Sequence, residues 1–350
     1  MERRPSLDGV RALCAAAVFA SHAFPGSGGG FFGVDVFFVL SGYLITRVLV
    51  DDVDRYGRVR FGRFYAHRAR RLLPAMIVAL ALAFALWPAG QREQFAGIVP
   101  PVLLYYVNWC LAFGRAIPVV PHFWTLSVEE QFYLLWPLVV AVVAARGQRT
   151  LAIVSCVLVI AFAAARALCS FVGPPAAEVF GYSSTLARAD QFLVGACAAA
   201  AHVSLDRVWR HKLTRAAGAL VWPAALALLA LFVTGGIGRW LPMGGFTAIA
   251  VASALVVIHC ATGDASCFNR LLGARPLVWV GRRSYGIYLF HLPIIEALEP
   301  LRHPGFGNAF AVTALSVMAT LGLTWASYEL VESRVMASPR AASPSLSSSV

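Results

Sequence analysis

The sequence predicts an all-α, polytopic integral membrane protein with about ten transmembrane helices. Of its 350 residues, 59% are hydrophobic and only 13% are charged, and the mean hydropathy is +0.71. A soluble domain has about a quarter of its residues charged. The apolar residues also gather in segments long enough to cross a bilayer. Together, these observations indicate a chain that lies largely in lipid.

The predicted spans follow one another along the whole chain, because a bilayer is crossed by about 17 to 25 helical residues. In chain order they are 7–24, 31–50, 72–90, 122–145, 151–172, 189–204, 217–235, 243–262, 284–301 and 308–332. The first span is predicted to be retained rather than cleaved as a signal peptide, since Asp8, Arg11 and His22 interrupt its apolar run.

The orientation of the spans follows from where the arginines fall. An eleventh apolar stretch, 95–113, is broken by Pro100 and Pro101, and we expect it to re-enter or to lie on the surface. The arginine-rich loops 51–71 and 206–215 then face the cytoplasm together with both termini, as the positive-inside rule requires. Counting 95–113 as a crossing would separate those two loops. We therefore expect a multi-pass cell-membrane protein with cytoplasmic N- and C-termini.

The chain is expected to form one membrane-embedded domain over residues 1–337, with no repeat of fixed period. The last stretch, 338–350, has the Ser, Pro and Ala composition of a disordered tail. On the adopted orientation this tail lies in the cytoplasm.

The net charge of +12 does not indicate a nucleic-acid partner. The arginines cluster between apolar segments, as topology alone would arrange them, and no groove-reading motif accompanies them. The seven cysteines form no CxxC pair, so neither a disulfide framework nor a metal site is indicated.

Two ionisable residues share one face of the first span. Each costs about 2.5 to 3.5 kcal/mol in a lipid-embedded helix, so such residues tend to face a protein interior or a watery cavity. The eleven positions from Arg11 to His22 make three turns plus about 20°, with a rise of about 16 Å. One helix face therefore carries a cation near one membrane surface and a titratable base toward the other.

Four further stretches place polar residues in or beside apolar segments. They are "GFFGVDVFFVLSGYLI" with Asp35, "RFYAHRARRLLP" with Arg68, Arg70 and Arg71, "HFWTLSVEEQFY" with Glu129 and Glu130, and "SYGIYLFHLPI" with His291. Gly33 and Gly42 in the first stretch allow close helix packing. On the adopted orientation the three carboxylates lie in the outer half of the bilayer with His22. His291 is expected about 10 Å from the cytoplasmic face, well away from His22.

These motifs, in this order, resemble the membrane acyltransferase-3 family, whose members O-acylate sugars of cell envelopes and secondary metabolites. The resemblance covers essentially all ten spans. It implies transfer of an acyl group, with acetyl favoured, from acyl-coenzyme A to a hydroxyl of a carbohydrate or glycosylated acceptor, with no permanently bound cofactor. The chain lacks the esterase-like C-terminal domain of some relatives, so we expect the membrane domain to carry out the whole transfer.

The chemistry of such a transfer assigns roles to the polar residues. A base must accept the hydroxyl proton, and His22 fits because imidazole titrates near neutrality. Glu129 or Asp35 would orient His22 and stabilise its imidazolium, with Glu130 a weaker candidate. The alternative is that a carboxylate pairs with Arg188 for packing.

The arginine cluster admits two interpretations. Arg68, Arg70 and Arg71, with Arg11 one turn further inside, suit the phosphates of the coenzyme A donor. They could instead set topology and contact anionic membrane lipid.

Two other function classes remain open from the sequence. Buried ionisable residues and helix-breaking prolines also mark transporters, here of an acylated or anionic solute. Against that class, no pair of interrupted spans in matching halves suggests an inverted repeat. A purely structural scaffold would leave the placement of Arg11 and His22 unexplained.

Overall fold

The computed structural model describes most of the chain. The described ranges are 4–24, 28–87, 92–172, 181–236, 238–262, 265–303 and 305–337. The predicted tail at 338–350 lies outside the described residues.

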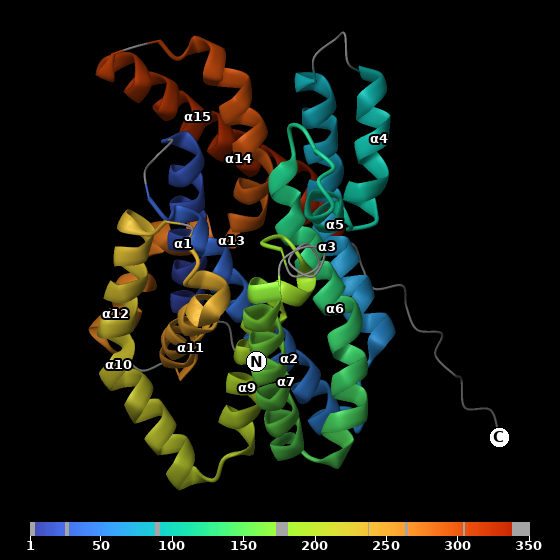
Figure 1. Cartoon of the computed structure of the whole chain (residues 1–350), viewed down its shortest axis with the longest axis vertical. Coiled ribbons are helices and arrows are strands. Elements are labelled where there is room, and N and C mark those ends of the chain that lie inside the picture. Colours follow the sequence, from blue (N-terminus) through green and yellow to red (C-terminus); the bar gives the residue numbers. More distant parts are fainter. Residues whose placement is uncertain are drawn as a thin grey trace, which may run out of the picture.

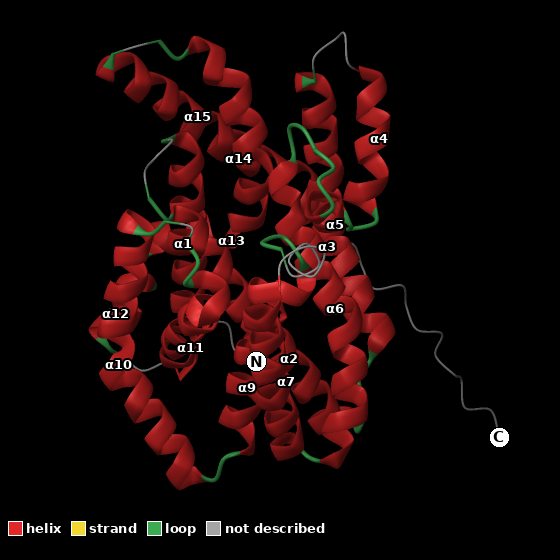
Figure 2. Ribbon diagram, viewed as in Figure 1, coloured by secondary structure: helices red, strands yellow, loops and turns green. Residues whose placement is uncertain are grey.

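Every regular element in these ranges is a helix (Figure 2). The α-helices are α1 (Pro5–Ala23), α2 (Gly33–Tyr56), α3 (Phe61–Leu86), α4 (Arg92–Leu103), α5 (Val107–Ala112), α6 (Trp124–Val143), α7 (Gln148–Val172), α9 (Thr185–Ser204), α10 (Arg207–Thr234), α11 (Phe246–Thr262), α12 (Cys267–Leu272), α13 (Arg275–Arg282), α14 (Ser284–Leu298), α15 (Phe306–Ser327) and α16 (Ser333–Ala337). Short 3-10 or π turns join several of them, including η1 (Gly30–Phe32) and η3 (Pro121–Phe123). The prediction of an all-α membrane bundle is confirmed.

In the described ranges, seven helices are long and apolar enough to cross a membrane. They are Gly30–Tyr56, Phe61–Leu86, Pro121–Arg146, Gln148–Val172, Arg207–Thr234, Leu241–Thr262 and Gly307–Met336. Each coincides with a predicted span. The other three predicted spans form α1, α9 and α14. Helices α1 and α9 are long enough but less apolar, and α14 is short. The predicted number of crossings is therefore not confirmed.

The segment 95–113 forms two short helices, α4 and α5, rather than one long one. Pro100 and Pro101 lie inside α4, so the break does not fall at the prolines. It falls after them, where Tyr105 takes a positive φ of 54° and the chain turns into α5.

Helices α2 and α9 lie at the centre of the bundle and contribute to both of its large apolar clusters. One cluster joins them to α3, α6 and α14, and includes Phe38 and Phe192. The other joins them to α1, α10, α11 and α12, and includes Leu40 and Ala199. In Figure 1, α10, α11 and α12 accordingly lie on one side of this centre, and α3, α4 and α6 on the other.

The outer faces of the bundle are apolar as well. On α7 the side chains of Ile153, Ile160 and Phe171 are all exposed. A water-soluble monomer rarely exposes so continuous an apolar face. The exposure is that of a surface solvated by lipid tails.

Glycines bring α2 and α9 into backbone contact. A Cβ added at Gly42 would lie 2.0 Å from the carbonyl oxygen of Phe192, and one at Gly195 would lie 2.1 Å from that of Val39. No side chain fits at either position. The close approach that the sequence predicted for Gly42 is confirmed, and it fixes the spacing of the two central helices.

We expect Gly195→Ala to lower the free energy of unfolding of the protein in detergent by about 1 to 3 kcal/mol, because the methyl group forces α2 and α9 apart. The matched control is Gly322→Ala in α15, where an added Cβ meets nothing within 4 Å. Thermal unfolding of the two purified variants checks this expectation. Equal unfolding temperatures would show that the α2–α9 contact does not limit stability.

Candidate functional site

Two histidines from distant parts of the sequence meet inside the bundle. His22 lies in the last turn of α1, and His291 lies in the middle of α14. Their ring nitrogens, His22 Nδ1 and His291 Nε2, are 3.3 Å apart. The prediction that His291 lies well away from His22 is therefore wrong. It assumed that α14 begins at the membrane surface.

The true depth of α14 follows from its neighbours. The hydroxyl of Tyr285, in the first turn of α14, donates to the carbonyl of Leu72 well inside α3. The chain before α14 is the short helix α13, and its Gly281 packs directly against the backbone of Asp8. Because α14 starts inside the bundle, His291, seven residues after Ser284, lies level with the end of α1, where His22 is.

A third histidine adjoins this pair. His122, in η3, has its ring centroid 5.0 Å from that of His291. Its Nε2 lies 3.3 Å from the carbonyl oxygen of Leu289, and its Nδ1 is buried with no hydrogen-bond partner. In the sequence, His122 is only the first residue of a predicted span. Its position at the head of the motif "HFWTLSVEEQFY" was the one signal available.

The carbonyl contacts determine which ring nitrogens carry protons. Nδ1 of His291 lies 2.7 Å from the carbonyl oxygen of Tyr288, and a carbonyl can only accept, so this Nδ1 donates. In a neutral ring Nε2 of His291 is then an acceptor. Nδ1 of His22 faces both that acceptor and, at 2.9 Å, the carbonyl of Val18, so it donates to them. The lone pair of neutral His22 is left on Nε2.

The two histidines are buried to different extents. His291 is 1% exposed, whereas His22 is half-buried. The ring that has a free lone pair is thus the accessible one, and the ring that orients it is sealed in the core. In the described part of the chain, no group of three His, Cys, Asp or Glu residues is arranged to hold a metal ion.

Glu129 is held by neighbours other than the histidines. It accepts a hydrogen bond of 2.5 Å from Ser41 Oγ on α2 and another from the hydroxyl of Tyr133 on its own helix. Within the described ranges the polar contacts of His22 go to Val18 and His291, so Glu129 does not contact His22 in this structure.

Glu130 points to a different partner. It accepts from Arg68 Nη2 at 2.8 Å, and the Arg68 guanidinium also lies over the Tyr133 ring, 3.3 Å from its centroid. This pair joins α3 to α6 in the bundle interior. Arg68 is therefore already charge-paired within the protein.

Arg11 and Arg71 face one cavity of about 360 Å³. We call it the donor cavity after the role that we propose for it below. Its other charged or titratable lining residues include Arg4, Asp8 and His67. Asp8 lies 3.4 Å from Arg11. Of the predicted arginine set, the structure thus brings Arg11 and Arg71 together.

Arg70 does not share this location. It is exposed, donates to the carbonyl of Ala66 in its own helix and is not among the residues that line the donor cavity. Its position is that of a surface arginine on α3.

Asp35 lies in a buried ion pair on the central helices. Its Oδ1 accepts from Arg188 Nη1 at 2.8 Å, and both side chains are 1% exposed. Gln191 donates to the same oxygen. Arg188 also stacks on Phe246, 3.9 Å from the ring centroid. This is the packing alternative that the sequence left open, and it holds α2 against α9.

A second buried pair lies on α9. Arg166 contacts both carboxylate oxygens of Asp190, at 2.6 Å and 2.9 Å, and Thr247 donates to Asp190 as well. Neither Arg166 nor Asp190 stands out in the sequence as a candidate site residue. The two residues lie on different helices, α7 and α9, and the sequence does not show that these helices pack together.

With this geometry in place, comparisons with known proteins identify the family. A family model described as an acyltransferase domain, Acyl_transf_3, matches residues 4–329. The chain belongs to the acyltransferase-3 family. No solved structure matches it significantly.

Similar proteins in this family come from several bacteria. YrhL of Bacillus subtilis (strain 168) is 34% identical over 348 residues, which cover 94% of this chain and 54% of that protein. The peptidoglycan O-acetyltransferase OatA of Listeria monocytogenes is 30% identical, over 95% of this chain and 55% of that protein. The O-acetyltransferase OatA of Staphylococcus aureus is 29% identical, over 95% and 57%. The chain thus spans about half the length of these relatives.

We expect Asp35→Ala to destabilise the protein by about 3 to 5 kcal/mol, because it leaves the charge of Arg188 buried without its partner. Asp35→Asn, which keeps a hydrogen-bond acceptor for Arg188, should cost less. The measurement is thermal unfolding in detergent, together with transfer activity of the folded fraction. An Asp35→Ala protein that unfolds like the parent but has lost transfer would restore the catalytic role predicted from the sequence.

Proposed function

We propose that this protein is a membrane O-acyltransferase that moves an acetyl group from acetyl-coenzyme A to a hydroxyl of a carbohydrate acceptor. The observation that carries the proposal is the contact between His22 and His291, which leaves the Nε2 lone pair of an accessible histidine free to take a proton. Membership in the acyltransferase-3 family supports the reaction class. The relatives named as O-acetyltransferases, one of them acting on peptidoglycan, support acetyl and a glycan acceptor.

The proton moves between the acceptor hydroxyl, His22 and the thiolate. Nε2 of His22 removes the hydroxyl proton as the oxygen attacks the thioester carbonyl. The tetrahedral intermediate collapses with cleavage of the carbon–sulfur bond, and His22 returns the proton to the departing thiolate. The products are an O-acyl ester and free coenzyme A. While His22 is charged, Nε2 of His291 accepts its Nδ1 proton in a hydrogen bond and stabilises the imidazolium.

His291 is thus a positioning residue for His22. In serine hydrolases an acidic residue holds the catalytic histidine in the correct tautomer and orientation. Here a neutral imidazole, itself fixed by the carbonyl of Tyr288, takes that place. A neutral partner avoids burying another charge in the bundle.

The donor cavity is the site where we propose that the coenzyme binds. Arg11 and Arg71 both line it, and guanidinium groups bind phosphate oxygens bidentately. Arg11 and His22 lie about 16 Å apart along α1. The coenzyme would bind at the arginine end of this helix, and its extended arm would carry the thioester toward the histidine end. On the positive-inside rule we assign the arginine end to the cytoplasm and the histidine end to the outer half of the membrane.

We expect His22→Ala to reduce transfer by about 10²- to 10⁴-fold, the usual contribution of a general base. The assay is acetyl transfer from acetyl-coenzyme A to envelope glycan fragments by the detergent-purified protein, followed by mass spectrometry. Near-normal turnover by a folded His22→Ala protein would exclude the general-base role. An acyl group larger than acetyl, or a product that is not a sugar, would refute the substrate assignment alone. A carrier of acylated solutes would release no coenzyme A.

The positioning role of His291 separates two substitutions. His291→Leu removes the acceptor for His22 Nδ1–H, and we expect kcat to fall by about tenfold or more while KM for the donor stays the same. His291→Gln retains an acceptor oxygen and should recover part of the loss. If both variants lose stability and activity to the same extent, His291 has only a packing role.

The donor cavity predicts a contrast between neighbouring arginines on α3. Arg71→Ala should raise KM for the acyl-coenzyme A donor by about tenfold, because it removes a phosphate contact made equally in ground and transition states. Arg70→Ala, which loses the same charge outside the cavity, should leave KM nearly unchanged. Donor titrations of both variants test this, and equal effects would assign Arg71 to membrane topology instead.

A further inference from the structure

A second cavity, of about 660 Å³, lies apart from the histidine site among the described residues. We call it the basic pocket. Its charged and titratable lining residues are Arg4, Arg47, His202, Arg207, Arg210 and His211. No carboxylate is among the residues that line it. A cavity with this lining concentrates positive potential and attracts anions.

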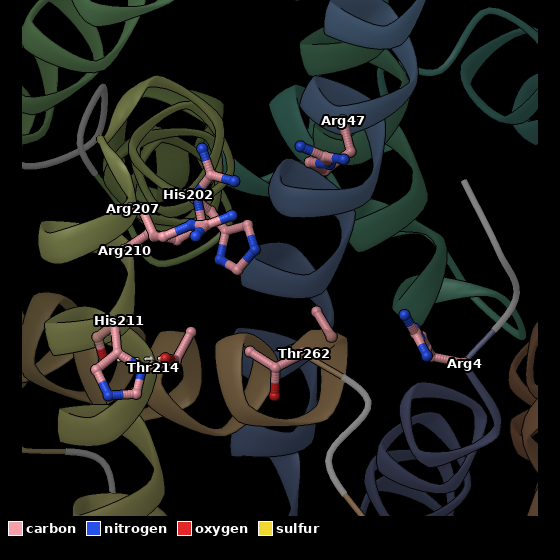
Figure 3. Close-up of a pocket in the computed structure, with 9 residues that line it drawn as sticks. Arg4, Arg47, His202, Arg207, Arg210, His211, Thr214 and Thr262 are labelled. Atoms are coloured by element: carbon pink, nitrogen blue, oxygen red, sulfur yellow. Dashed lines mark hydrogen bonds between the residues drawn. The ribbon is translucent and has the colours of Figure 1, made fainter.

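The arginines converge on the pocket from separate parts of the sequence. Arg47 comes from the second half of α2, Arg207 and Arg210 from the first turn of α10, and Arg4 from the residue before α1. Figure 3 shows these side chains arranged around a common space, with His202 from the end of α9 beside Arg207 and Arg210. Arginine side chains from helices far apart in the chain therefore lie around one pocket.

The contacts of Arg47, Arg210 and His202 leave much of their hydrogen-bonding capacity unused. The carboxylate of Asp51 lies 3.6 Å from Arg47, at the long end of an ion pair. Arg210 donates to the backbone carbonyls of Val203 and Leu205, which are uncharged. Nδ1 of His202 is buried with no hydrogen-bond partner. The pocket thus has several donors and a net positive charge still available.

Membrane topology alone does not require this arrangement. The positive-inside rule is satisfied by arginines anywhere in a cytoplasmic loop. Arg215, on the same helix as Arg207, is such a residue, since it is exposed and does not line the pocket. The pocket also has the volume of a small-molecule site, which is about 300 to 1,000 Å³. A single phosphate group would fill only a fraction of it.

We propose that the basic pocket is a binding site for a ligand that carries more than one phosphate group. Guanidinium groups match phosphate oxygens bidentately, and arginines on opposite sides of the space suit two phosphates rather than one. Two sources supply this chemistry at a membrane surface: the nucleotide end of a coenzyme A donor, and the headgroup of cardiolipin, an anionic lipid with two phosphate groups.

Arg4 links the pocket to the donor cavity, because it lines both. A coenzyme could thus place its nucleotide phosphates in the basic pocket and lead its arm past Arg11. This choice of source rests on the proposed function. The phosphate site itself does not, since it follows from the lining of the pocket alone.

The test uses the full chain purified in detergent. The variant is Arg47→Gln with Arg207→Gln, which removes one cation from each of two helices. The matched control is Arg215→Gln. Arg210 is left in place because its backbone contacts hold the turn between α9 and α10. The single variant Arg207→Gln, at an exposed position, serves as a second variant if the double one unfolds.

Calorimetry measures the binding of inorganic pyrophosphate, coenzyme A and dephospho-coenzyme A. Co-purification from vesicles of phosphatidylcholine with and without cardiolipin measures retention of a lipid with two phosphate groups. We expect the double variant to bind pyrophosphate about tenfold more weakly than the parent, and the control to bind it within about twofold. A parallel loss of coenzyme A binding identifies the donor as the source. Unchanged coenzyme A binding with loss of retained cardiolipin identifies the lipid.

The proposal is overturned if the parent protein binds no pyrophosphate and the double variant matches the control with every other probe. None of these measurements requires turnover. They can be repeated in the His22→Ala background, where the proposed transfer is absent. Loss of transfer with intact binding, or of binding with intact transfer, therefore separates the failure of one proposal from the failure of the other.

Discussion

An ionisable group inside a membrane bundle must find its partner within the bundle, and this constraint organises the whole molecule. The two pairs on α9, Arg188 with Asp35 and Arg166 with Asp190, are sealed from solvent. Because each pair bridges two helices, α9 is held at the centre between α2 and α7. The same requirement pairs Arg68 with Glu130 across α3 and α6. The histidines of α1 and α14 contact each other and backbone carbonyls rather than a carboxylate, and they are the groups to which we assign the proton transfer.

The sequence predicts the fold class well because hydropathy and span length depend on local composition. It places seven of the spans where the structure has long apolar helices, and fails to settle the crossing number at α1, α9 and α14. Buried ionisable residues interrupt the apolar sequences of α1 and α9, and α14 is short, with 15 residues. Depth along the membrane normal was the less predictable quantity. A helix such as α14, which begins below the surface after the short helix α13, shifts every residue on it, and for this reason His291 was placed away from His22.

In the candidate site, too, spacing within one helix could be predicted from the sequence, whereas contacts between helices could not. Arg11 and His22 lie on one helix, so their spacing could be computed from helical geometry alone. Their partners could not, because the choice between Asp35, Glu129, Glu130 and His291 depends on how helices pack across more than a hundred residues of chain. The carboxylates were reasonable candidates by depth, yet one pairs with Arg188 and another with Arg68. His122 gave no signal of its own, since a single histidine at the start of an apolar helix has many possible reasons to be there.

The donor cavity and His22 occupy opposite ends of one helix, and this separation has a kinetic consequence. In the proposed mode of binding, Arg11 and Arg71 would contact the phosphates of coenzyme A, which the acylated and free forms have in common. Such an enzyme would bind free coenzyme A about as tightly as acyl-coenzyme A, so the two would compete for the same site. Its turnover would then follow the ratio of acylated to free coenzyme in the cell rather than the concentration of either, and envelope modification would track the state of carbon metabolism.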